Sequence, residues 1–239
     1  MSSEHRGSLY LLPNTLGEAP PESVIPAPVL DRARALDYFI AEDPKTARAF
    51  LKRIGVSLPL QSIRIERLDH NTRDGDIAAL LEPVLAGRNA GLLSEAGLPA
   101  IADPGANLVR LAHQRGVRIV PLSGPSSILL ALAASGLEGQ RFAFHGYLPI
   151  DEGKLSAALK DMERQSRHLG QTQIFIETPY RNDRSLAAML RALDPATLVC
   201  VAADLTLESE TVQTQPVAAW RKKPQRLKGR PTVFLLLAE

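Results

Sequence analysis

The sequence predicts an α/β protein of two domains, the first with a mainly parallel sheet and the second with a mixed sheet. Strand-like apolar runs alternate with helical segments from residue 8 to residue 136, which is typical of a parallel sheet covered on both faces. Strand-like runs follow one another more closely later in the chain, which favours antiparallel pairs. The 239 residues, 45% of them hydrophobic, suffice for two cores. We place the domains at residues 1–145 and 146–239.

The elements of the first domain follow from apolar spacing and from the glycines and prolines that punctuate it. Pro44 suits the first turn of a helix, and Gly116 follows a segment with helical spacing. Residues 18–28 contain four prolines and are expected to be irregular. The predicted strands are 8–12, 38–41, 63–68, 90–93 and 117–121, and the predicted helices are 29–36, 45–54, 77–86, 106–115 and a last one from Ser126 or Ser127 to Gly136.

The second domain shows shorter intervals between its strand-like runs. One more strand, 142–144, ends the first domain, and residues 145–149 are expected to form a hinge or linker. The predicted strands of the second domain are 173–177, 198–203, 211–214 and 232–238, and its predicted helices are 154–168, 183–193 and 217–222.

Two loops rich in glycine and proline, Ser94–Gly105 and Ser123–Ser127, are the main functional signal. Each follows a strand of the predicted parallel sheet, so both are expected at its carboxyl edge, where open α/β sheets bind ligands. Gly97 removes side-chain bulk and permits unusual dihedral angles. Free amides at the start of the helix after the second loop would attract a carboxylate or phosphate. The pair of loops predicts a ligand site.

Several classes of function find no support in the sequence. It contains no G-x-G-x-x-G, no P-loop and no G-x-S-x-G motif, and its five histidines are scattered, so no metal is expected. The net charge of +2 neither requires nor excludes a nucleic-acid partner. The single cysteine, Cys200, lies in an apolar run and is expected to be a buried, reduced thiol, which fits a cytoplasmic protein. No apolar run approaches the roughly 20 residues of a membrane helix.

The amino-acid sequences of these loops resemble motifs of a known family. Residues 94–105 are similar to S-D-A-G-T-P-x-I-S-D-P-G, and residues 121–127 to P-L-P-G-P-S/C-A, of the tetrapyrrole methylase superfamily of S-adenosylmethionine-dependent methyltransferases. The branch that methylates a ribose 2′-oxygen of small-subunit ribosomal RNA is the most similar. Its A-E-D-T-R, H-x-H-N, F-Y-E-S-x-x-R and R-E-L-T segments resemble residues 41–45, 69–71, 175–181 and 203–206, in the same order.

The resemblance implies an enzyme that binds S-adenosylmethionine in a cleft between its two domains. It also implies a homodimer whose partner is ribosomal RNA or the small ribosomal subunit, without metal or membrane. Carried over by position, the cofactor contacts fall at Pro13, Ala96, Gly97, Leu98, Ile101, Ser126, Ser127, Glu177 and Ala203.

The sequence also departs from the family pattern. Glu95 and Leu98 stand where the family has aspartate and threonine, and the chain ends where the RNA-methylating branch usually has a further small helical domain. It therefore resembles a short form of that branch, and two alternatives stay open. One alternative is methylation of a small molecule such as a tetrapyrrole. Another is a protein that binds S-adenosylmethionine or RNA without turnover.

Methyl transfer to a ribose hydroxyl needs little from the protein beyond orientation, exclusion of water and help for a weak nucleophile. A nearby base or cation would supply that help. The candidates follow predicted strands of the first domain and are Glu42, Asp43, Lys45 and His70. The alternative is that one of the two carboxylates caps the next helix and that the histidine is a solvated loop residue.

A basic run close to the end of the chain is a candidate RNA contact. Its six cations are uninterrupted by any acid, and they are Arg221, Lys222, Lys223, Arg226, Lys228 and Arg230. Phosphate binding suits such a run, and a solvated loop is the alternative. No aromatic residue is interleaved for base stacking, so backbone recognition is expected.

Overall fold

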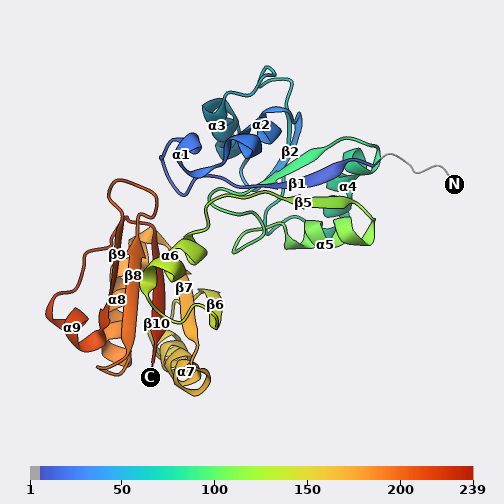
Figure 1. The fold of residues 1–239 in the computed structure, drawn as a ribbon. Helices are drawn as coiled ribbons and strands as arrows, with labels where there is room; N and C mark the ends of the chain where they lie inside the picture. Colours follow the sequence, from blue (N-terminus) through green and yellow to red (C-terminus); the bar gives the residue numbers. More distant parts are fainter. Residues whose placement is uncertain (1–5, 239) are drawn as a thin grey trace. The chain divides into compact units, whose positions relative to one another are not determined.

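The computed structural model describes residues 6–238, which form two compact units that divide between Ser126 and Ser127 (Figure 1). The first contains one five-stranded sheet and the second contains another. The boundary expected after residue 145 falls within strand β6 (Phe142–Tyr147) of the second unit.

The first unit is built on a parallel sheet with strand order β3-β2-β4-β1-β5. Buried apolar residues line both of its faces. Helices α2 and α3 cover one face, and α4 and α5 cover the other (Figure 1). The strands are β1 (Ser8–Leu12), β2 (Tyr38–Ala41), β3 (Arg64–Arg67), β4 (Ala90–Leu93) and β5 (Arg118–Pro121), and the helices are α1 (Pro21–Val24), α2 (Ala27–Arg34), α3 (Pro44–Ile54), α4 (Asp74–Leu85) and α5 (Ala106–Gln114).

The second unit is built on a mixed sheet with strand order β6-β7-β10-β8-β9, in which only β6 and β7 run parallel. One core joins α7, α8 and α9 to the sheet around the buried side chains of Phe175, Trp220 and Phe234. The remaining strands are β7 (Thr172–Glu177), β8 (Leu198–Ala203), β9 (Thr211–Pro216) and β10 (Thr232–Leu237), and the helices are α6 (Ser127–Ser135), α7 (Glu152–Leu169), the short η1 (Pro179–Arg181), α8 (Asn182–Ala192) and α9 (Val217–Lys222). The predicted fold class, with a parallel and a mixed sheet, is confirmed.

Two local predictions are wrong. Residues 145–147 continue β6 instead of forming a linker, because the strand passes through an irregularity between Phe144 and Tyr147 and resumes its pairing with β7. The proline-rich segment 18–28 is partly helical, because Pro21 begins α1 and Pro28 lies in the first turn of α2. A proline fits this position since the first helical amides have no partner within the helix.

Candidate functional site

Three loops meet at the carboxyl edge of the first sheet. Strand β1 lies between β4 and β5, so the segment that follows β1 separates the two loops singled out in the sequence. Asn14 and Gly97 form an antiparallel bridge, with N···O distances of 2.8 and 3.2 Å. The loop after β4 is therefore attached directly to the segment after β1.

Asn14 holds this junction and was not recognised as a site residue in the sequence. Its buried side-chain amide donates to the carbonyl oxygens of Ser94 (3.2 Å) and Glu95 (2.9 Å), and its side-chain oxygen accepts from the Thr15 amide (2.8 Å). The Ser94 hydroxyl also donates to the carbonyl of Gly97 (3.2 Å). The turn at residues 94–97 is thus fixed by buried hydrogen bonds, whose loss is costly.

Two glycines allow the loops to pack against one another. Gly97 has φ +70°, and a Cβ there would lie 3.3 Å from the Leu16 side chain and 3.5 Å from the Pro125 carbonyl oxygen. A Cβ on Gly124 would lie only 2.1 Å from Cβ of Pro13. The loop after β5 therefore lies directly against the segment after β1, and glycine is required for this approach.

Backbone strain is confined to two loops of the described chain. Four residues other than glycine have positive φ: Ala100 and Ala102 on the loop after β4, and Asp204 and Thr206 on the loop after β8. Such conformations are unfavourable for non-glycine residues and persist where the surrounding structure imposes them, often at ligand sites. In each unit the strained residues follow the carboxyl end of a strand.

An acidic cluster lies at the same edge of the first sheet. Burial, and then the negative charges of Glu42 and Glu95, raise the pKa of the Asp103 carboxyl to about 6. Burial and the Glu95 charge also raise the pKa of Glu42, whose carboxylate lies 3.9 Å from Nδ1 of His70. A carboxyl that titrates near neutral pH is suited to accept a proton during a reaction. Asp103 was missed as a catalytic candidate because this effect depends on residues distant in sequence.

The four catalytic candidates occupy different environments. Glu42 follows strand β2 and His70 follows strand β3, and the Glu42 carboxylate lies 3.9 Å from Nδ1 of His70. Asp43 is the N-cap of α3, where its carboxylate accepts from the Lys45 amide (3.0 Å) and from the amide and hydroxyl of Thr46 (3.3 and 2.9 Å). These hydrogen bonds, that from Lys45 foremost, lower the pKa of Asp43. The side chain of Lys45 is exposed.

Replacing Asp43 with alanine is expected to lower the melting temperature by about 2–4 °C, because the first turn of α3 loses its cap. The measurement is thermal unfolding followed by circular dichroism, with activity assayed well below the transition. Asp43→Asn is the matched variant, since asparagine caps helices without a negative charge. It should keep both stability and activity. A large loss of activity in Asp43→Asn would instead assign the carboxylate a catalytic role.

Six of the residues with implied cofactor contacts lie in the first unit, on or next to the three packed segments. They are Pro13, Ala96, Gly97, Leu98, Ile101 and Ser126. Ile101 is 44% exposed, an unusual exposure for a large apolar side chain, so the loop after β4 presents apolar surface.

The other three implied contacts belong to the second unit. Ser127 begins α6. Glu177 ends β7, where its carboxylate accepts from the Arg181 guanidinium (2.6 Å) and the Thr178 amide (2.7 Å). Ala203 ends β8 with a fully buried side chain. No observation tests these nine contacts, and they stay predictions.

The basic run contains two kinds of residue. Arg221 donates to the carbonyls of Leu190 (2.7 Å) and Leu193 (3.0 Å), and Arg230 donates to the Asp204 carboxylate (2.6 Å). Both therefore stabilise the second unit. The remaining four cations are exposed and available to a ligand: Lys222, Lys223, Arg226 and Lys228.

Comparison with known proteins assigns the family. The sequence model of the tetrapyrrole (corrin/porphyrin) methylases matches residues 27–219. The chain belongs to this family. Among its relatives is a "Ribosomal RNA small subunit methyltransferase I" of Escherichia coli O157:H7, 34% identical over 234 residues, which cover 96% of this chain and 78% of that protein. A protein of the same name from Vibrio cholerae is 34% identical over 210 residues, covering 88% and 69%.

Solved structures show the same fold. The methyltransferase CobJ aligns with a TM-score of 0.64 at 16% identity, covering 97% of this chain and 94% of its own. Uroporphyrin-III-C-methyltransferase from Thermus thermophilus aligns with a TM-score of 0.55 at 17% identity, covering 97% and 92%. This tetrapyrrole methylase family member is thus a methyltransferase with the fold of its family.

Among residues 6–238, no helix combines the length and apolar character needed to span a membrane. No group of three or more histidine, cysteine, aspartate or glutamate side chains is arranged there to hold a metal ion.

Proposed function

We propose that the protein transfers the methyl group of S-adenosylmethionine to a ribose 2′-hydroxyl of small-subunit ribosomal RNA, acting as a homodimer in the cytoplasm. The observation that carries the proposal is the packing of three loops around Gly97 and Gly124, beside the acidic cluster of Glu42, Glu95 and Asp103. The names of the relatives support RNA as the acceptor.

The residues present fit the proposed cofactor. Gly124 lets the loop after β5 lie against Pro13, and Gly97 adopts φ +70°, so the three loops pack together at the sheet edge where a ligand is expected. The apolar, exposed Ile101 and the exposed Ala96 leave the loop after β4 open to an adenosine or methionine moiety. When bound, S-adenosylmethionine supplies a methyl group already activated as a sulfonium.

The chain itself must orient the acceptor and take its proton. Asp103 is half-buried and titrates near pH 6, so at neutral pH it is mostly ionised and can accept the proton of the ribose hydroxyl. Glu42 lies in the same cluster and raises the affinity of Asp103 for that proton. Asn14 acts as a positioning residue, because its hydrogen bonds fix the turn at residues 94–97.

Replacing Asn14 with alanine is expected to weaken S-adenosylmethionine binding about tenfold. The carbonyls of Ser94 and Glu95 lose their donor, and the bridge to Gly97 is no longer fixed by the side chain. Loss of such buried partners costs about 1–3 kcal/mol, and 1.4 kcal/mol corresponds to a factor of ten. Calorimetric titration with S-adenosylmethionine measures the effect. Asn107→Ala, an exposed position on α5, is the control and should bind normally. Equal affinities in the two variants would contradict the role of Asn14.

The acceptor is tested by transfer of radiolabelled methyl to small-subunit particles that lack the native modification, with a total small-molecule extract assayed in parallel. Label in the RNA supports the proposal. Label only in the extract would move the protein to small-molecule acceptors such as tetrapyrroles. Absence of label in both, with cofactor binding verified by calorimetry, would favour a binding protein without turnover.

A further inference from the structure

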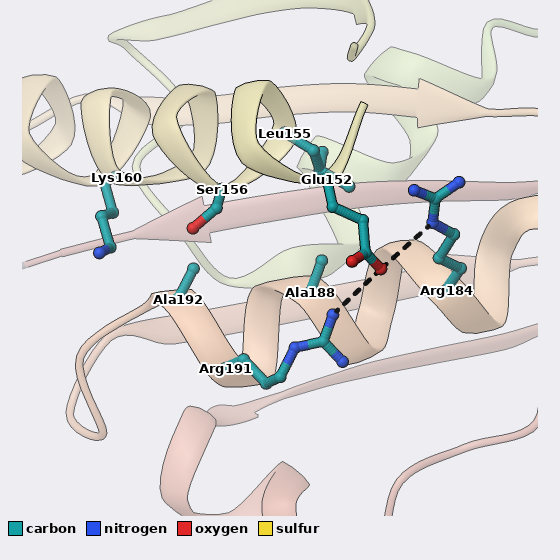
Figure 2. A pocket seen from close by; sticks show the side chains of 8 residues that line it. All are labelled: Glu152, Leu155, Ser156, Lys160, Arg184, Ala188, Arg191 and Ala192. Carbon is teal, nitrogen blue, oxygen red and sulfur yellow. Dashed lines mark ion pairs between the residues drawn. The ribbon is translucent and has the colours of Figure 1, made fainter. Parts of the chain in front are cut away.

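Helix α8 in the second unit is flanked by two hollows that share one arginine. The smaller hollow, of about 100 Å³, lies between α7 and α8 and is lined by Ser156, Lys160, Arg184 and Arg191 (Figure 2). The larger one, of about 660 Å³, lies between α8 and the start of the basic run. Arg191 lines both hollows.

The smaller hollow has a positive character. Glu152 is the only acid that lines it, and its carboxylate lies between two guanidinium groups, 3.9 Å from Arg184 and 4.0 Å from Arg191 (Figure 2). These are long, exposed ion pairs, which stabilise a protein very little. The side-chain ammonium of Lys160 makes no hydrogen bond or ion pair within residues 6–238. Three cations against one loosely held carboxylate suit a phosphate group.

The larger hollow combines apolar walls with cations. Leu186, Ala187, Leu190 and Pro224 supply the apolar surface. Asp183, the only acid among its lining residues, accepts a hydrogen bond from the Leu227 amide (2.6 Å).

Arg191, Arg221, Gln225 and Arg226 complete the lining, and the guanidinium of Arg226 has no polar partner in the described chain. A nucleoside fits such a place, because its flat base can lie on apolar surface and stack on a guanidinium plane. The volume lies within the range of about 300–1,000 Å³ that small-ligand pockets occupy.

We propose that this surface binds a single-stranded segment of RNA, with a phosphate in the smaller hollow and an unstacked nucleoside in the larger one. Three exposed lysines stand next to lining residues of the larger hollow in the sequence and would add positive charge for neighbouring phosphates: Lys222, Lys223 and Lys228. The inference rests on the proposed function, since it takes RNA as the acceptor, and it adds α7 and α8 to the basic run as RNA-contacting elements.

The test uses the full chain and a short fluorescein-labelled single-stranded RNA of mixed sequence, with anisotropy measured over a range of KCl concentrations. The double variant Lys160→Ala/Arg191→Ala is expected to raise Kd about tenfold at low salt. Its slope of log K against log salt should become shallower by about 0.7, since one phosphate contact to a single strand is lost and each contributes about that amount. The matched control, Lys154→Ala/Arg110→Ala, removes one lysine and one arginine that are exposed and outside both hollows.

A second variant tests the apolar hollow without changing charge. Ala187→Phe places a ring in the space that the nucleoside would occupy, so Kd should rise several-fold while the salt slope stays unchanged. Circular dichroism confirms folding in each case.

The proposal is overturned if the unchanged chain does not bind the RNA, if Lys160→Ala/Arg191→Ala behaves like its control, or if a poly-glutamate peptide displaces the RNA at equal charge concentration. The binding assay requires no methyl transfer. A chain that binds RNA as described and methylates none would contradict the proposed function while supporting this surface.

Discussion

Replacing Gly124 with alanine is expected to abolish S-adenosylmethionine binding at concentrations that saturate the unchanged protein. The new Cβ would lie 2.1 Å from Cβ and 2.4 Å from Cγ of Pro13, far inside van der Waals contact. Neither neighbour is a flexible side chain, so the loop after β5 must move away from the segment after β1. Overpacking of this kind costs about 1–3 kcal/mol. The same displacement separates Pro125 from Gly97 and opens the loop junction.

Calorimetry and thermal unfolding measure the two consequences, lost affinity and a lower melting temperature. Gly139→Ala is the matched control, because a Cβ there meets no atom within 4 Å. The control should match the unchanged chain in both measurements. Normal cofactor affinity in a folded Gly124→Ala variant would show that the packed loops do not hold the cofactor.

Replacing Asp103 with asparagine is expected to reduce kcat by about 10²-fold or more while leaving the affinity for S-adenosylmethionine within a few-fold. The asparagine keeps the size of the side chain and cannot accept the proton. In the unchanged enzyme the rate should fall as the pH drops through about 6, where Asp103 becomes protonated. This inflection should disappear from the pH profile of the variant. A variant with full activity and the same inflection would exclude Asp103 as the proton acceptor.

Asp103→Asn is expected to reduce kcat but to raise the melting temperature at alkaline pH. Since burial raises the pKa of Asp103 from an ordinary 3.8 to about 6, the folded state binds its proton more tightly than the unfolded state. The resulting stabilisation is present below the ordinary pKa and is lost as the pH rises through about 6. Asp103→Asn should therefore melt at a higher temperature than the unchanged chain at about pH 8 and lose this advantage at about pH 4. A constant difference at both pH values would contradict a perturbed carboxyl.

The sequence was sufficient to predict the fold class because each domain has clear local patterns. Strand β8 and helix α9 occupy the predicted residues, since their ends are determined by neighbouring polar residues and prolines. The error at residues 145–147 has a different origin. Pairing with β7 extends β6 through Gly146, and such pairing cannot be detected from local composition.

The functional loops were recognised by their glycines and prolines, whereas their mutual arrangement was not. The position of β1 between β4 and β5 depends on the whole sheet, so the role of Asn14 as a clamp could not be seen in the sequence. The raised pKa of the Asp103 carboxyl depends first on its burial in the folded chain and then on the charge of Glu42, which is distant in sequence.

The basic run shows the same limitation. Its arginines and lysines look equivalent in sequence, yet two of them make hydrogen bonds within the second unit. Arg221 donates to the Leu190 carbonyl of α8, and Arg230 donates to the Asp204 carboxylate. Arg191 of α8 does not belong to that run, but it lines both hollows of the proposed RNA surface. Side-chain direction, which depends on packing, separates the structural cations from those free to bind.

The central claim, methylation of a ribose 2′-hydroxyl in RNA, is tested most directly by alkaline hydrolysis of RNA labelled by the enzyme with radioactive methyl. Alkali cleaves RNA through attack of the free 2′-hydroxyl on the adjacent phosphate, so a methylated 2′-oxygen protects the bond that follows it. The account predicts that the label appears in an alkali-stable dinucleotide. Label recovered in mononucleotides would place the methyl group on a base and contradict the account.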